Sequence, residues 1–358
     1  MLPTGAAVQV VSERQEAVGS AGSGSLPYLE TIDVLRGIAS LWVCWFHINT
    51  RGLVELNPIL AATGAPGDVG VAMFFVISGF VIPYSLYRGR YKFSNFARFL
   101  AKRIVRLDPP YLAAIVLAIA VPYLTSRSSF HRGAIYHPNW IQVLAHLGYA
   151  NAFIGFPWLV GGFWSLAIEF QYYVILALTF PALLVRKWSG LTGLYLVSGL
   201  AAILLPQRYM LPHYLPLFLI GISGFRYYVL RVSRWELAVC LAYSGLLTAY
   251  TEQTFYAVAA VLTCLCIVFV RYSNRPLQFL GAISYSLYVT HQTIYAIPIA
   301  QAVRFLGNRA IVRLVAPFVS LAFCLAVAWC LYKAVELPAR KLSARFKYGA
   351  AKARTAAV

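Results

Sequence analysis

Charged residues are scarce in this chain of 358 residues: only 11% are Asp, Glu, Lys or Arg, and 60% are hydrophobic. An ordinary soluble domain carries about a quarter charged residues, so the composition excludes a soluble globular enzyme. The six cysteines all fall inside apolar segments and show neither the CxxC nor the His/Cys spacing of a metal or redox site. We therefore expect no metal. The chain also lacks a hydrophilic block long enough for a separate folded domain.

Apolar stretches of about 20 residues, the length that crosses the hydrocarbon core of a bilayer, recur along most of the chain. They predict an all-α polytopic membrane protein, with about ten transmembrane helices in one bundle. We expect residues 1–27, rich in Gly, Ala and Ser, to be a disordered cytoplasmic tail, 28–340 to form the membrane domain, and 341–358 to be a basic cytoplasmic tail. The predicted spans are 32–50, 68–87, 107–125, 162–184, 190–206, 212–230, 235–250, 254–271, 279–302 and 311–335.

The basic residues predict the orientation of these spans. Lys and Arg number 30 against 11 acidic residues, which gives a formal net charge of +19. The predicted inner loop 88–106 holds seven basic residues and no acid, whereas the long outer loop 126–161 holds two basic residues. The positive-inside rule then places both termini in the cytoplasm. Because the basic clusters adjoin spans and no soluble domain presents them, we expect contacts with membrane lipids and no nucleic-acid partner.

Ionisable side chains inside spans are costly, so each is a candidate functional residue. The first span carries Asp33 and Arg36 near its inner end and His47 eleven positions after Arg36. Eleven residues make about three turns and roughly 16 Å of helix, so Arg36 and His47 project from nearly the same face. The simpler alternative is a local Asp33–Arg36 ion pair at the interface, with His47 a satisfied polar residue near the outer surface.

Two further spans contain polar residues among aromatic ones. Ser78 and Gly79 interrupt the apolar run of the second span, which close helix packing or the approach of a narrow ligand would explain. Glu169 lies in the fourth span between Trp164 and Tyr173. A carboxylate at that depth needs a partner, and we expect Arg36, His47 or a bound sugar. A purely structural pair is the alternative.

Arg103 and Arg106 are three positions apart, hence neighbours on one helical face, where two guanidinium groups suit bidentate contact with phosphate. Orientation in the membrane or lipid headgroups would explain either arginine alone. They precede Pro109-Pro110, where we expect a helix to begin anew. His291 lies in an apolar setting near the ninth span. Glu336 and Arg340, four apart at the end of the last span, are predicted to pair along a helix.

Together these segments resemble the acyltransferase 3 family, membrane enzymes that O-acylate bacterial surface glycans and related molecules. The resemblance covers roughly residues 30–340, with its motifs in the family's order. The aromatic sequence that usually follows the Glu of the fourth motif varies mildly here, and no soluble module follows the last span. The motifs are Arg36 to His47, FFxISGF at Phe74–Phe80, RxxR at Arg103 and Arg106, WSLxxExxxY at Trp164–Tyr173, SYSLYxxH at Ser284–His291, and ExP at Glu336–Pro338.

The resemblance implies a ten-helix fold in the bacterial cytoplasmic (inner) membrane. It implies acetyl-CoA, or another acyl-CoA, as co-substrate, and an acceptor hydroxyl on a cell-surface or exported carbohydrate or a lipid-linked glycan. It makes His47, Arg36, Glu169 and Asp33 the catalytic candidates. Arg103, Arg106, Ser78 and Gly79 are candidates for binding the donor. Trp164, Tyr173 and His291 are candidates for a substrate-binding or structural role.

The chemistry expected from these residues is O-acyl transfer, with His47 as general base on the acceptor hydroxyl, because imidazole ionises near neutral pH. Glu169 or Asp33 would orient the imidazole or stabilise its protonated form. Arg36 would either disfavour protonation of His47 or stabilise the developing oxyanion. Direct transfer and an acyl-enzyme on His47 or Ser78 both remain open. The alternative function is a transporter or flippase of a lipid-linked or anionic substrate, although the two halves of the chain show no internal repeat.

Overall fold

The structure is a computed structural model that describes residues 29–50, 57–126, 139–185 and 188–346. These ranges contain helices and no strand, which confirms the all-α class. The predicted tail 1–27 and most of the predicted tail 341–358 lie outside the described residues. The elements are α2 (Glu30–Thr50), α3 (Pro58–Gly64), η1 (Ala65–Val69), α4 (Gly70–Arg88), η2 (Phe93–Asn95), α5 (Phe96–Ser126), α6 (Trp140–Leu147), α7 (Asn151–Ile154), α8 (Phe163–Leu183), α9 (Trp188–Leu204), α10 (Leu211–Leu230), α11 (Arg234–Thr251), α12 (Thr254–Phe269), α13 (Arg275–Ile294), α14 (Ala296–Leu306), α15 (Ala310–Leu331), η3 (Tyr332–Glu336) and α16 (Leu337–Ser343).

Several helices are long and apolar enough to cross a membrane. Within the described ranges five segments meet both conditions, and three further apolar helices are shorter. Every predicted span overlaps a helix, so the apolar pattern located helices correctly, while a count of ten membrane crossings is not confirmed. The five segments are Glu30–Thr50, Pro58–Arg88, Phe93–Thr125, Phe163–Leu183 and Ala310–Ser343.

The helix that carries Arg103 and Arg106 begins earlier than predicted. We expected residues 88–106 to be a loop and a new helix to start at the proline pair, but α5 starts at Phe96 and runs through Pro109 and Pro110. A proline removes one helical hydrogen bond, and neighbouring groups in a bundle can satisfy the backbone that it disturbs. Here the Tyr285 hydroxyl donates to the carbonyl oxygen of Leu107 at 2.8 Å. Both arginines therefore sit on a continuous helix.

The last two predicted spans are each interrupted. The ninth is two helices, α13 and α14, that meet at Tyr295. The tenth continues from α15 through the π-helical turn η3 into α16, which takes in the start of the predicted basic tail. Single π-helical turns commonly occur at functional positions. The Glu336 carboxylate in this turn accepts from the backbone N–H of Ser286 (3.2 Å) and from its hydroxyl (2.6 Å), so it joins this turn to α13.

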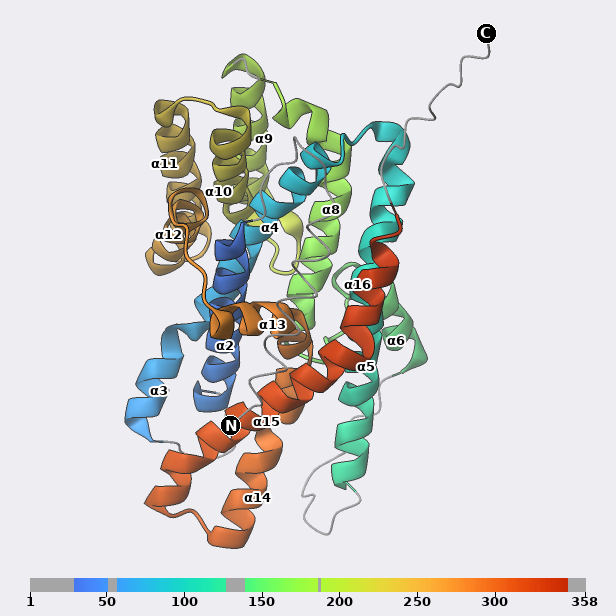
Figure 1. Ribbon diagram of the computed structural model, residues 1–358, viewed down its shortest axis with the longest axis vertical. Helices are drawn as coiled ribbons and strands as arrows, with labels where there is room; N and C mark the ends of the chain where they lie inside the picture. Colours follow the sequence, from blue (N-terminus) through green and yellow to red (C-terminus); the bar gives the residue numbers. More distant parts are fainter. Residues whose placement is uncertain (1–28, 51–56, 127–138, 186–187, 347–358) are drawn as a thin grey trace.

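Glycines allow two helix pairs at the centre of the bundle to approach closely. A Cβ atom on Gly281 of α13 would lie 2.1 Å from the carbonyl oxygen of Asp33 on α2, and one on Gly221 of α10 would lie 2.1 Å from that of Val76 on α4. Small residues at helix contacts are the usual device for such packing in membranes. In Figure 1, α9 to α12 gather on one side and α5 lies beside α16 on the other, with α2, α4, α8 and α13 between them.

Candidate active site

The central helices enclose two neighbouring cavities. The first, which we call the arginine chamber, has about 760 Å³ of empty space including its opening to solvent. Its charged lining residues are three arginines and one glutamate, so its walls carry an excess of positive charge. Its lining consists of Arg36, Val71, Phe74, Phe75, Ile77, Ser78, Val81, Ile82, Arg103, Arg106, Leu107, Ser165, Leu166, Glu169, Tyr173, Tyr285 and Tyr288.

The second cavity, which we call the histidine chamber, is larger, with about 1440 Å³ of empty space including its opening to solvent. It combines His47 with aromatic rings, two carboxylates and one arginine. Its lining consists of Val43, Phe46, His47, Asp68, Val71, Ala72, Phe75, Gly161, Gly162, Trp164, Arg208, Tyr209, Tyr214, Leu217, Glu252, Tyr256, Tyr288, Gln292 and Tyr295.

The two chambers share a wall made of Val71, Phe75 and Tyr288, which line both. On α2, Arg36 lines the arginine chamber and His47, eleven residues later, lines the histidine chamber. The helices α4, α8 and α13 likewise pass from one chamber to the other along their length. Since eleven residues of helix span roughly 16 Å, the chambers are stacked along the helix axes and meet at the shared wall.

Arg103 illustrates how the arginine chamber holds its cations. Its side chain is only 7% exposed, and its guanidinium carbon lies 5.4 Å from the centre of the Phe99 ring and 5.5 Å from that of Tyr173. Such cation–π contacts hold the plane of the group. Its Nε atom is buried without a hydrogen-bond partner among the described residues. A buried donor without a partner is costly, so this group is suited to an anionic ligand.

Glu169 is the one carboxylate that lines the arginine chamber within the described ranges. The Ser78 hydroxyl donates to its Oε1 atom at 2.7 Å. We expected Arg36, His47 or a bound sugar as its partner, and the structure places Ser78 there, because α4 and α8 pack side by side at this level. Ser78 and Glu169 therefore form one polar unit beside the arginines.

The hydrogen bonds of His47 assign its tautomer. Its Nδ1 atom lies 2.9 Å from the carbonyl oxygen of Val43, which can only accept, so Nδ1 carries the proton. The same N–H faces Nε2 of His291 at 3.3 Å. His291 in turn donates from Nδ1 to the carbonyl oxygens of Leu287 (3.0 Å) and Tyr288 (2.9 Å). The Nε2 atom of His47 is thereby left as a proton acceptor, the form that a general base requires.

Gln292 is a site residue that the sequence analysis missed. Its side-chain Nε2 contacts Nε2 of His47, and its Oε1 accepts from the backbone N–H of Gly162 at 2.7 Å. Because a backbone N–H can only donate, Oε1 must face Gly162 and the NH₂ group must face His47. The signal that could have found it is its position directly after His291, an amide among apolar residues of a predicted span.

Three predicted site residues, Asp33, Gly79 and His291, line neither chamber. Asp33 is buried where α2 meets α13. Gly79 packs against α10, where a Cβ atom on it would lie 2.3 Å from the carbonyl oxygen of Phe218. The structure thus places Gly79 in helix packing. Within the described residues, no three His, Cys, Asp or Glu side chains are grouped in a way that could hold a metal ion.

Aromatic and acidic side chains line the histidine chamber. Trp164 stacks on Tyr214 with ring centres 5.0 Å apart and planes at 28°. The Tyr256 hydroxyl donates to Asp68 at 2.5 Å. Glu252 pairs with a histidine just outside the chamber wall, at 2.8 Å. A flat aromatic surface beside carboxylate acceptors can bind a ring that presents both C–H groups and hydroxyls.

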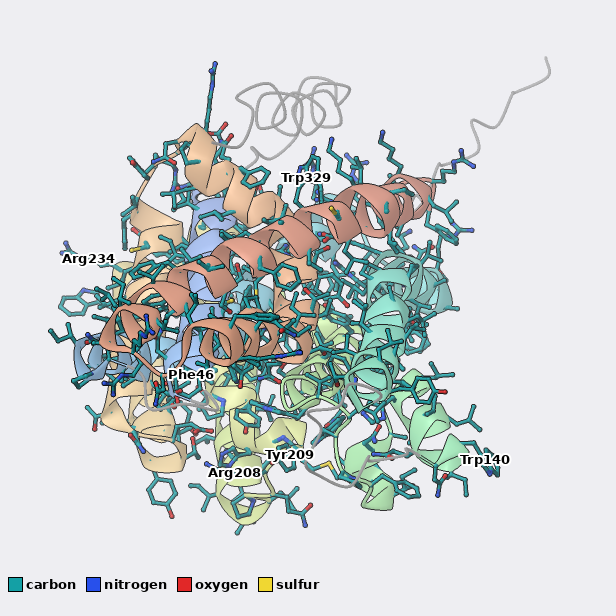
Figure 2. The ribbon with its side chains drawn as sticks, turned by 90° about the horizontal axis from the view of Figure 1, so that it is seen from below. Phe46, Trp140, Arg208, Tyr209, Arg234 and Trp329 are labelled. Carbon is teal, nitrogen blue, oxygen red and sulfur yellow. The ribbon has the colours of Figure 1, made fainter. Side chains whose placement is uncertain are left out.

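Figure 2 views the molecule from below, and Phe46, Arg208 and Tyr209 lie near one another in this projection. All three line the histidine chamber. Trp140, on α6, lies apart at the edge of the same view and is 70% exposed. These three lining residues come from α2 and from the segment that leads into α10, whereas Trp140 does not line the chamber.

The sequence is similar to those of known acyltransferases. A family model described as an acyltransferase domain matches residues 29–333. The chain is 33% identical over 157 residues to the putative peptidoglycan O-acetyltransferase YrhL of Bacillus subtilis, and 30% identical over 168 residues to the O-acetyltransferase OatA of Staphylococcus aureus. These matches cover 41% and 44% of this chain but only 23% and 26% of the two relatives.

A relative of more similar length is the putative acetyltransferase ORF330 of Acidianus two-tailed virus, 26% identical over 291 residues, which are 74% of this chain and 82% of the viral protein. No solved structure gives a significant match. The family match therefore extends across both chambers, whereas the matches to the two bacterial relatives concern about a quarter of each of those proteins.

Proposed function

The chain belongs to the acyltransferase domain family, and we propose that it moves an acetyl group from acetyl-CoA to a hydroxyl of a cell-surface or exported carbohydrate. The observation that carries the proposal is the pair of stacked chambers. One is lined by three arginines, the other by a histidine with an accepting nitrogen, and they share one wall. A polyanionic donor and a neutral hydroxyl acceptor would each find a matching environment, and their reactive groups would meet at that wall.

The arginine chamber fits an acyl-CoA. Arginine binds phosphate oxygens through charge-assisted, bidentate hydrogen bonds, and the buried Nε of Arg103 lacks a partner in the described structure. Arg106 lies one helical turn further along α5, and Arg36 faces it from α2. Ser78 donates its proton to Glu169, so its oxygen remains available as an acceptor for an amide of the donor's arm. The thioester would then lie toward the shared wall.

The histidine chamber fits a carbohydrate acceptor. The stacked Trp164 and Tyr214 rings offer a surface for the C–H face of a sugar, and Asp68 and Glu252 can accept from its hydroxyls. One relative carries peptidoglycan in its name, which makes a glycan of the cell envelope the first acceptor class to examine.

The proposed chemistry assigns His47 the role of general base. Its Nε2 takes the proton of the acceptor hydroxyl while the acceptor oxygen forms a bond to the thioester carbonyl carbon. Arg36 is the lining cation on the same helix and would stabilise the negative charge that develops on the carbonyl oxygen. The C–S bond then breaks, and the thiolate of CoA takes the proton back from Nε2 of His47. The products are the acetyl ester and CoA thiol, and His47 is regenerated.

The same proposal gives the orientation of the protein. The arginine chamber would open toward the cytoplasm, where acyl-CoA is found. The basic segment 88–106 lies at that end of α4 and α5, consistent with the positive-inside rule. The histidine chamber would then face the outer side of the bacterial cytoplasmic membrane, where surface glycans pass.

Acetyl-CoA labelled in the acetyl group would test this function with purified protein in lipid vesicles and fragments of envelope glycans. We expect label on the glycan in equal amount to the CoA thiol released. Label that accumulates inside the vesicles without an ester product would instead support the transporter alternative. Label bound covalently to the protein without acceptor would replace direct transfer by an acyl-enzyme.

A further inference from the structure

The nitrogen of His47 that would act as the base, Nε2, already accepts a hydrogen bond within the protein. Its Nε2 atom accepts from the side-chain NH₂ of Gln292, whose orientation is fixed because its Oε1 accepts from the N–H of Gly162 at 2.7 Å. The other nitrogen of the ring is held separately, by the carbonyl oxygen of Val43 at 2.9 Å and by His291. The ring orientation therefore has its own anchors, and the contact with Gln292 is not needed for it.

The loop before α8 is shaped for this contact. A Cβ atom on Gly161 would lie 3.2 Å from Oε1 of Gln292, and one on Gly162 would lie 3.5 Å from it. A side chain at Gly161 would crowd the amide, while the glycine lets the backbone N–H of Gly162 reach it. Gln292 and both glycines line the histidine chamber, so the amide stands between the proposed acceptor site and the base.

We propose that Gln292 is a positioning residue that keeps His47 from activating water, and that the acceptor hydroxyl must displace its amide from Nε2. The inference rests on the proposed function and adds its regulation. A thioester held in a membrane channel beside a free imidazole would be hydrolysed, because water can use the same base as the acceptor.

The chamber explains why a carbohydrate displaces the amide more readily than water does. A sugar brings binding energy from contacts remote from its reacting hydroxyl, such as those with Trp164 and Asp68, and this energy can offset the loss of one hydrogen bond. A water molecule has no such remote contacts. Gln292 would therefore couple base activation to occupation of the acceptor site.

The test is the Gln292→Met variant, which keeps the length of the side chain and removes both polar atoms. We measure CoA release from acetyl-CoA without acceptor and transfer to a glycan fragment with acceptor. Loss of one ordinary hydrogen bond to the base corresponds to about a 3- to 10-fold rise in hydrolysis. The KM for acetyl-CoA should stay unchanged, since Gln292 does not line the arginine chamber.

Gln171 provides the matched control. It is also a glutamine whose Oε1 accepts from a backbone N–H of another segment, that of Leu211 at 2.9 Å, but it lines neither chamber. Gln171→Met should leave the rate of hydrolysis at the wild-type level. If Gln292→Met fails to fold, Gln292→Asn serves instead, because it keeps the amide but cannot reach His47 while still bonded to Gly162.

Each outcome decides between the two claims. Increased hydrolysis with unchanged donor KM supports the inference, because a purely structural defect would lower both reactions. Equal hydrolysis by wild type and by both Gln292 variants, while wild type still transfers acetyl to glycan, overturns the role of Gln292 and leaves the proposed function standing. Neither hydrolysis nor transfer by any folded protein overturns both.

Discussion

Substitution of Arg103 distinguishes a role in binding the donor from a role in stabilising the fold. It is buried between the Phe99 and Tyr173 rings, and its Nε atom has no hydrogen-bond partner in the described structure. Arg103→Met keeps an apolar side chain that also packs well on aromatic rings. We expect binding of CoA to weaken while the folded state is unchanged or more stable.

The magnitudes follow from the contacts. A hydrogen bond to a charged group contributes about 1.5–3 kcal/mol, so the Kd for CoA should rise roughly 10- to 150-fold. Replacing a buried charge that lacks a full set of partners by an apolar residue is often neutral or stabilising. Tm should therefore stay the same or rise.

Arg226→Met is the matched control, because Arg226 is also buried but forms an ion pair with Glu236 at 2.9 Å and donates to the carbonyl oxygen of Val185 at 2.9 Å. Removing one partner of a buried pair costs about 3–5 kcal/mol, so this variant should lose Tm and keep its CoA affinity. Isothermal titration with CoA and thermal unfolding in detergent measure both quantities. An Arg103→Met protein that is less stable yet binds CoA as wild type does would refute the binding role.

Two further predictions concern stability. Gly79→Ala should lower the free energy of unfolding, since its Cβ would lie 2.3 Å from a backbone oxygen of Phe218 that cannot move aside. Overpacking costs about 1–3 kcal/mol, which exceeds the gain in helix propensity of about 1 kcal/mol. An unchanged Tm would contradict this prediction and show that α4 and α10 can separate. His146 is buried on α6, outside the spanning segments, and burial lowers its pKa below the ordinary 6.5. Its Nε2 accepts from the N–H of Leu159 at 3.1 Å, so below about pH 6.5 the unfolded chain binds a proton that the folded chain does not, and Tm should fall between about pH 7 and pH 5. His146→Asn should show a smaller fall over that range, and an equal fall in both proteins would contradict this assignment.

The sequence predicts those features of the site that depend on residues close together in the chain. The spacing of Arg36 and His47 on one helix fixes their separation along the axis, and the structure places them in two different chambers, one at each depth. Arg103 and Arg106 were correctly grouped because they are neighbours on α5. The predicted helix start at Pro109-Pro110 was wrong, since the effect of a proline on a helix depends on neighbouring groups such as Tyr285, which is 178 residues away from Leu107 in the sequence.

The partners of the buried polar groups could not be predicted, because they depend on which helices pack together. Ser78 and Glu169 are 91 residues apart, and Gln292 and His47 are 245 apart. Hydropathy located α4, α8 and α13 but contains no information about their neighbours. Only the packed bundle shows that Gln292 contacts His47.

We propose that His47 acts on the acceptor and takes no part in binding the donor. Measuring the CoA affinity and the rate of acetyl transfer of His47→Ala beside wild type tests it most directly. His47 lines the histidine chamber and not the arginine chamber, so we expect an unchanged Kd for CoA and a loss of transfer of about 100-fold or more, the contribution of a general base. A His47→Ala protein that transfers acetyl at the wild-type rate would contradict the account.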